Sequence, residues 1–222
     1  MIIYQIFTRL FGNNNTTNKP HGTLEENGCG KMDFYTTAVL NRIKRLGVTH
    51  IWLTGIIRHA TATDYSAYGI PRQHPDIIKG MAGSPYAICD YYDIDPDLAT
   101  NPAERMKEFE ELLSRIHKAG LKVIIDFVPN HVARQYHSIA KPDGVKDLGE
   151  NDDKNCNFSI KNNFYYCWGQ PFEPPFPSCR PERPAPYSEI PAKATGNDCF
   201  SPTPSPSDWY ETAKLNYGID YC

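Results

Sequence analysis

The sequence lacks a long apolar run, and it lacks an excess of basic residues. Its apolar runs are all well short of the roughly 20 residues that a transmembrane helix needs. The chain carries 23 Lys and Arg against 26 Asp and Glu, a formal net charge of −3, so the composition gives no sign of binding to nucleic acid or to an anionic membrane. The N-terminus does not resemble a secretory signal either. We therefore expect a chain with no membrane span and no nucleic-acid partner.

A C-x-x-C pair is also missing, which argues against a zinc ribbon or a thioredoxin-type motif. Five of the seven cysteines fall in the last third of the chain, at positions Cys156, Cys167, Cys179, Cys199 and Cys222. This spacing fits a loop-rich segment stapled by disulfides, and the alternative is unpaired thiols in a reducing compartment. Pairing of these cysteines would favour export to the periplasm, the cell surface or the outside. If the parent protein is exported, we expect at least one disulfide among these five cysteines.

The apolar pattern over the first 131 residues predicts an α/β fold. It alternates strands with helices: strands at 2–7, 48–53 and 121–127, and helices at 33–47 and 101–120, with an irregular stretch over 54–100. Asn101 and Glu104 form the expected capping box of the second helix. A strand, helix, strand order predicts parallel strands joined by right-handed crossovers. The pattern fits either a doubly wound sheet or the first part of a β/α barrel.

The segment at 121–131, which reads L-K-V-I-I-D-F-V-P-N-H, carries the clearest functional signal. Its apolar run reads as a strand buried on both faces, and it ends at Asp126. Asn130 and His131 follow within a few residues. Polar side chains at the carboxyl end of such a strand lie where α/β folds bind their ligands. The segment therefore predicts an active-site rim, although a loop-capping Asp126 and a surface His131 would also fit.

The character of the chain changes after His131. Residues 142–222 hold 12 of the 19 prolines and many aromatic residues, without a helical stripe of useful length. So many aromatic residues argue against disorder. We predict a barrel portion at 1–131 and a loop-rich inserted subdomain at 132–222.

Four segments in the same order resemble the α-amylase family of glycoside hydrolases. D-F-V-P-N-H at 126–131 is similar to a signature region of that family, and I-I-Y-Q-I-F-T-R at 2–9 and G-V-T-H-I-W-L-T at 47–54 are similar to its first two barrel strands. S-P-Y-A-I-C-D-Y-Y-D-I-D-P at 84–96 resembles the segment before its second helix. The resemblance implies the first three β/α units of a TIM-type barrel, with a B-like subdomain inserted after the third strand. The barrel would be incomplete within these residues.

The resemblance also implies roles for single residues. Asp126 would be a supporting acid, His131 would hydrogen-bond the sugar at the cleavage subsite, and Tyr86 would stack on that sugar. Asn130 would be a calcium ligand in members that bind calcium, and an amide oxygen suits that ion. Ala87 stands where the family usually has an aspartate.

The resemblance implies a retaining glycoside hydrolase that acts on α-glucans or α-glucosides. The family's nucleophile aspartate and acid/base glutamate follow its fourth and fifth strands, which we place beyond Cys222, in the remainder of the parent chain. We therefore expect no catalytic carboxylate pair here and no activity from these 222 residues alone.

Other functions are open at this point. A transglycosidase or a sugar isomerase of the same family would share these segments, and so would a non-catalytic module that binds carbohydrate or a partner protein. A doubly wound nucleotide-binding fold would want G-x-G-x-x-G after the first strand. Residues 8–16 read T-R-L-F-G-N-N-N-T instead, which excludes that fingerprint.

Overall fold

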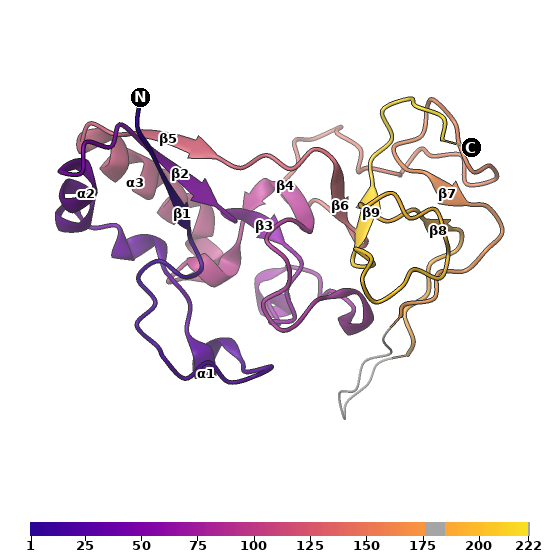
Figure 1. The fold of residues 1–222 in the computed structure, drawn as a ribbon, viewed down its shortest axis with the longest axis horizontal. Helices are drawn as coiled ribbons and strands as arrows, with labels where there is room; N and C mark the ends of the chain where they lie inside the picture. Colours follow the sequence, from indigo (N-terminus) through magenta and orange to yellow (C-terminus); the bar gives the residue numbers. More distant parts are fainter. Residues whose placement is uncertain (176–184, 222) are drawn as a thin grey trace. The chain divides into compact units, whose positions relative to one another are not determined.

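A computed structural model describes residues 1–175 and 185–221 of the chain. The chain forms two compact units, each built from segments that are not contiguous in sequence (Figure 1). The first unit comprises Met1–Arg58, Thr63–Arg72 and Tyr91–Phe127, and the second comprises His59–Ala62, Gln73–Asp90 and Val128–Cys222. These units group residues by their contacts, whereas the predicted boundary after residue 131 separates a barrel portion at 1–131 from an insertion at 132–222. The predicted boundary stays a prediction.

The first unit contains a parallel sheet of three strands, in the order β1-β2-β5. The strands are β1 (Ile3–Phe7), β2 (His50–Thr54) and β5 (Lys122–Ile125), close to the positions predicted from the sequence. Figure 1 shows them side by side and running in the same direction. The sheet is not closed into a barrel within the described residues.

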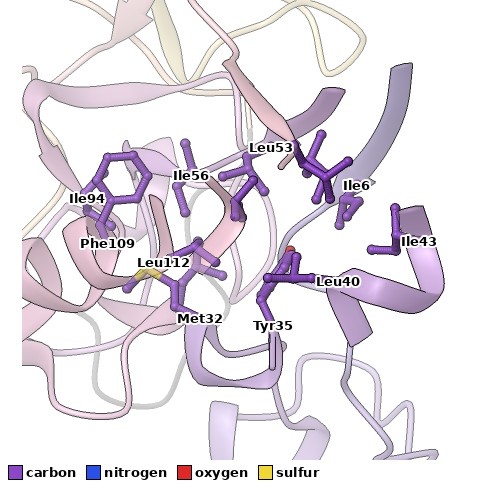
Figure 2. Close-up of a cluster of buried hydrophobic side chains, with 14 of the residues drawn as sticks. Ile6, Met32, Tyr35, Leu40, Ile43, Leu53, Ile56, Ile94, Phe109 and Leu112 are labelled. Carbon is purple, nitrogen blue, oxygen red and sulfur yellow. The ribbon is translucent and has the colours of Figure 1, made fainter. Parts of the chain in front are cut away.

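Two helices cover one face of this sheet, as the strand, helix, strand pattern predicts. They are α2 (Thr37–Lys44) and α3 (Arg105–Lys118). Both end just before a glycine with positive φ, Gly47 at 82° and Gly120 at 75°, a conformation that glycine adopts without steric cost. The core between helices and sheet is apolar (Figure 2), and its labelled members are Ile6, Met32, Tyr35, Leu40, Ile43, Leu53, Ile56, Ile94, Phe109 and Leu112.

The start of α3 differs in detail from the predicted capping box. Asn101 caps a 3-10 turn at Pro102–Glu104 that leads into the helix. Glu108, rather than Glu104, accepts hydrogen bonds from the backbone N–H groups of Thr100 and Asn101, at 2.8 and 2.7 Å. The added 3-10 turn shifts the helix start by one turn, so the reciprocal acidic residue lies four positions further along.

The stretch at 54–100 is more regular than predicted. It contains β3 (Ile57–His59) and β4 (Ile88–Ile94), which form a two-stranded sheet. Aspartate is depleted in strands, and the two aspartates inside β4 hid it from the sequence pattern. Asp93 is buried because Arg105 holds both of its carboxylate oxygens, at 2.7 and 2.8 Å, and Arg58 lies 3.0 Å away.

The remaining elements of the first 130 residues are short. They are α1 (Leu24–Asn27) and five 3-10 turns at Met32–Phe34, Ser66–Tyr68, Pro75–Ile77, Pro96–Leu98 and Pro102–Glu104.

The second unit is mostly loop, and its described residues contain two short antiparallel strand pairs. β6 (His131–Ala133) pairs with β9 (Thr212–Lys214), and β7 (Tyr166–Cys167) pairs with β8 (Ala192–Lys193). Because these strands have two or three residues, no alternating pattern marks them in the sequence. Side chains of the unit also hydrogen-bond to backbone groups of its loops, among them those of Asp90, Arg134 and Asp152.

The predicted disulfide is not tested by the structure. Cys29, Cys156 and Cys199 are free thiols, whereas Cys179 and Cys222 lie outside the described residues. The disulfide, and the export that it would indicate, therefore stay predictions. Over the described ranges, no helix has the length and apolar character needed to cross a membrane.

Candidate functional site

A pocket of about 390 Å³ lies in the second unit. It is lined by two exposed aromatic side chains, an imidazole, one ion pair and smaller residues. The lining residues are Lys79, Ser84, Tyr86, Val128, His131, Trp209, Glu211 and Thr212. All of them come from the loop before β4, the residues that flank the start of β6, and the segment that enters β9. A volume of this size falls in the range of small-molecule sites.

His131 is fixed at the pocket by the strand pair β6 and β9, where it lies opposite Lys214. The side-chain amide of Asn130 holds it further, because Nδ2 lies 3.0 Å from His131 Nδ1 and donates to Gly196 O at 2.7 Å. Gly196 leaves no room for a side chain here. A Cβ at that position would lie 2.7 Å from His131 Cγ and 2.6 Å from Thr212 Oγ1. This close backbone approach keeps the imidazole in one place.

Two aromatic side chains form part of the pocket wall. Tyr86 is 46% exposed and Trp209 is 43% exposed, and both line the pocket. The Trp209 ring meets the His131 ring edge to face, with centroids 5.2 Å apart at an interplanar angle of 60°. An amphipathic aromatic surface beside a polar ring suits a ligand that has both C–H faces and hydroxyl groups.

The imidazole of His131 is neutral at neutral pH. Burial lowers its pKa below the usual 6.5, the nearby Lys214 ammonium lowers it further, and a hydrogen bond to the Tyr86 backbone opposes both effects. A neutral ring has one donor nitrogen and one acceptor nitrogen. The amide N–H of Asn130 faces Nδ1, so the contacts favour an accepting Nδ1.

We expect the imidazole of His131 to titrate at lower pH in the folded chain than in the urea-unfolded chain. Because the folded pKa is the lower one, the unfolded state binds protons first as the pH falls. The contribution of His131 to stability is therefore full above pH 6.5 and is lost as the pH drops toward and through the folded pKa. An NMR titration of the imidazole carbons, assigned with His131→Gln, measures both values. A folded pKa equal to or above the unfolded one would contradict the described environment.

The structure brings three of the four predicted site residues together. Tyr86 and His131 line the pocket, and Asn130 contacts His131. Asp126 belongs to the first unit. It follows β5 directly, and its Oδ1 accepts a hydrogen bond from Trp52 Nε1 of β2. Asp126 is thus held at the carboxyl end of the parallel sheet, where the sequence placed it.

The contacts of Asn130 do not form a calcium site by themselves. Calcium binds oxygen ligands, but the Asn130 amide uses its N–H group toward its neighbours. The register partner of His131 is Lys214, a cation that disfavours a second positive charge. Within the described ranges, no group of three or more His, Cys, Asp and Glu side chains is arranged to hold a metal. The role of Asn130 as a calcium ligand stays a prediction.

Sequence reasoning missed several lining residues, above all Lys79, Trp209 and Glu211. Lys79 and Glu211 lie 132 positions apart in the numbering, and only the fold brings their charges to 3.1 Å. Trp209 was visible as one of the aromatic residues of the loop-rich region. No further local pattern marked it as a residue of the pocket.

Comparison with known proteins finds one family and several related sequences. The family model described as "Alpha amylase, catalytic domain" matches residues 5–179. A cyclomaltodextrin glucanotransferase from Bacillus sp. (strain 6.6.3) is 29% identical over 142 residues, which is 60% of this chain and 18% of that protein. The enzyme of the same name from Geobacillus stearothermophilus is 28% identical over 141 residues, with the same coverage. The chain thus spans about a fifth of the length of these relatives.

Among solved structures, an α-amylase from Lactobacillus plantarum is 30% identical, with a TM-score of 0.41, covering 62% of this chain and 24% of that one. A trehalose-6-phosphate hydrolase from Bacillus licheniformis is 30% identical, with a TM-score of 0.39, covering 61% and 18%. The family match extends over most of the chain and includes both the parallel sheet and the start of the loop-rich region. The chain belongs to the α-amylase catalytic-domain family.

Proposed function

We propose that the pocket of the second unit binds a glucosyl unit of an α-glucan or α-glucoside. The observation that carries this proposal is the meeting of Tyr86, His131 and Trp209 at one pocket. The aromatic faces of Tyr86 and Trp209 would contact the C–H face of the sugar. The imidazole of His131, which is fixed by Asn130, would contact a hydroxyl. The family match and the names of the relatives, which are glucanotransferases of cyclomaltodextrins, support a glucose-based ligand.

The parent reaction that we propose is retaining cleavage of an α-glucosidic bond, within a barrel whose first three strands are β1, β2 and β5 and whose first two helices are α2 and α3. A retaining mechanism needs two carboxyl groups about 5–5.5 Å apart. Among the residues that line the described pocket, Glu211 is the sole carboxylate. The pocket therefore accounts for binding, and we place the nucleophile and the acid/base outside it.

Transglycosylation is a second candidate, because the relatives reported above are named glucanotransferases. Hydrolysis and transfer share the glycosyl-enzyme intermediate and differ in the acceptor, which is water or a second sugar. A binding module without catalysis is a third candidate, and it is favoured by the single carboxylate at the pocket. All three require that the pocket bind a glucosyl unit.

Replacing Tyr86 by alanine tests that requirement. We expect maltotriose to bind the wild-type chain and Tyr86→Ala to weaken this binding by about tenfold or more, because truncating a central aromatic contact typically costs more than 1 kcal/mol. Isothermal titration calorimetry measures the Kd. Tyr68→Ala is the matched control, since Tyr68 is 45% exposed and does not line the pocket.

Two outcomes would contradict the proposal. One is the absence of maltotriose binding to correctly folded wild-type chain. The other is an equal loss in Tyr86→Ala and Tyr68→Ala, which would place the binding surface elsewhere.

A further inference from the structure

The pocket contains an ion pair that the aromatic platform does not explain. Lys79 Nζ lies 3.1 Å from Glu211 Oε2, and both residues line the pocket. Glu211 is only 5% exposed, and its Oε2 accepts no hydrogen bond from the described residues in spite of this short separation. A buried carboxylate oxygen without a directed hydrogen bond is costly. The pair therefore holds unused hydrogen-bonding capacity at the wall of the pocket.

We propose that Lys79 and Glu211 together determine which sugar the pocket accepts, by binding a hydroxyl of an uncharged glucosyl unit between them. A hydroxyl both donates and accepts, so it can donate to the Glu211 carboxylate while it accepts from the Lys79 ammonium. The inference rests on the proposed glucosyl binding and adds its polar recognition element.

The two partners differ in freedom to move. Glu211 Oε2 is enclosed by protein atoms, and the backbone of Glu211 is fixed because its carbonyl accepts from Arg134 N at 3.0 Å. The Lys79 side chain is 37% exposed and donates to Asp208 O at 3.2 Å. Lysine has a long flexible stem. Lys79 is therefore the member that turns aside to admit a hydroxyl to the carboxylate.

The charge balance indicates which ligands are excluded. The charges of Lys79 and Glu211 cancel each other. The other lining residues are Ser84, Tyr86, Val128, His131, Trp209 and Thr212, and burial keeps the His131 imidazole neutral by lowering its pKa. A phosphorylated sugar would place an anion beside the buried Glu211 carboxylate, where like charges repel. The pocket is built for a neutral sugar and against a phosphosugar.

Glu211→Gln separates this role from the general binding function. The amide keeps the volume of the side chain but removes its charge, so the pocket gains a net positive charge from Lys79. We expect the Kd for maltose to rise by about tenfold, because a hydrogen bond to a charged group is replaced by a neutral one. We expect the Kd for maltose 6′-phosphate to fall in the same variant, so that the preference reverses.

Calorimetry with both sugars on the wild-type chain and on Glu211→Gln, Lys79→Met and Glu173→Gln gives the answer. Glu173 is exposed and outside the pocket, so Glu173→Gln should match the wild type. Lys79→Met should weaken binding of both sugars. Thermal melts show whether each variant is folded. If Glu211→Gln does not fold, the recognition role is tested by the affinities of Lys79→Met and by the preference of the wild-type chain for maltose over maltose 6′-phosphate.

Each result has a distinct meaning. Maltose binding that is unchanged in Glu211→Gln and Lys79→Met, but lost in Tyr86→Ala, would overturn the recognition role and leave the glucosyl pocket standing. A wild-type chain that prefers the phosphorylated sugar would also overturn it. Failure of the folded wild-type chain to bind either sugar would overturn both proposals together.

Discussion

Arg134→Met is expected to lower the free energy of unfolding by about 3–5 kcal/mol, since breaking a buried ion pair leaves an uncompensated charge. The Arg134 side chain has no exposed surface. Its Nη1 lies 2.5 Å from Glu189 Oε1, and its Cζ lies 3.7 Å from the centre of the Phe172 ring. Without the guanidinium, Glu189 keeps only part of its countercharge, from Lys193 at 3.1 Å.

The Arg134 guanidinium also donates hydrogen bonds to the backbone of the second unit. Three carbonyl groups accept hydrogen bonds from it at 2.9–3.0 Å, those of Tyr210, Lys193 and Thr212. Tyr210 and Thr212 flank Glu211 at the pocket, so the loss reaches the candidate site. Burial alone would raise the pKa of Glu189, but the cations Lys193 and Arg134 hold that pKa below its ordinary value. The stability that Glu189 contributes is therefore present above its unfolded pKa and is lost as the pH falls through the folded one.

Urea unfolding followed by circular dichroism measures this effect. Arg134→Lys keeps the charge but not the planar fork of donors, so we expect a smaller loss than in Arg134→Met. Arg72→Met is the control, because the Arg72 side chain is 70% exposed and its pair with Asp64 lies at the surface, where ion pairs contribute little. Equal losses in Arg134→Met and Arg72→Met would contradict the described network.

Much of the first unit could be predicted from the sequence because its signals are local. The short apolar runs of β1, β2 and β5 and the helical stripe of α3 are visible in the sequence, and Gly47 and Gly120 mark helix ends. β4 was missed because its two buried aspartates are compensated by groups that are distant in sequence. Asp93 pairs with Arg58 and Arg105, and Asp90 accepts hydrogen bonds from residues 138–140. Such compensation is a property of the folded chain and leaves no periodic pattern.

In the candidate site, too, residues with a local sequence signal were predicted and residues that depend on tertiary contacts were not. Asn130 and His131 were predicted because they follow an apolar run, and Tyr86 because its segment resembles a family pattern. The run was expected to be buried on both faces, but β5 lies at the edge of the described sheet and is half-buried to exposed. Glu211 and Lys79 were not found, since each is an ordinary charged residue until the fold pairs them. Gly196 is needed at its position only because the backbone of its loop passes so close to the His131 ring that a side chain would not fit. Packing of this kind between distant loops depends on tertiary contacts that no local pattern encodes.

Purified 222-residue chain is expected to bind maltotriose without hydrolysing it. The pocket presents one lining carboxylate, and Asp126 is engaged by Trp52 in the first unit. Retaining cleavage needs a nucleophile and a proton donor together. Enzymes accelerate such reactions by at least about 10⁶-fold, so the loss of the pair takes turnover below detection while leaving affinity intact.

A paired measurement tests this expectation: calorimetry for binding and a reducing-end assay for cleavage, both on the same repurified sample. Binding without release of reducing ends is the expected result. Release that co-elutes with the chain through successive columns would contradict it, and Glu211→Gln would then show whether Glu211 supplies a catalytic carboxylate. Tyr86→Ala serves as a second control, because contaminating amylase would continue to cleave in that preparation whereas cleavage at this pocket would fall with the affinity.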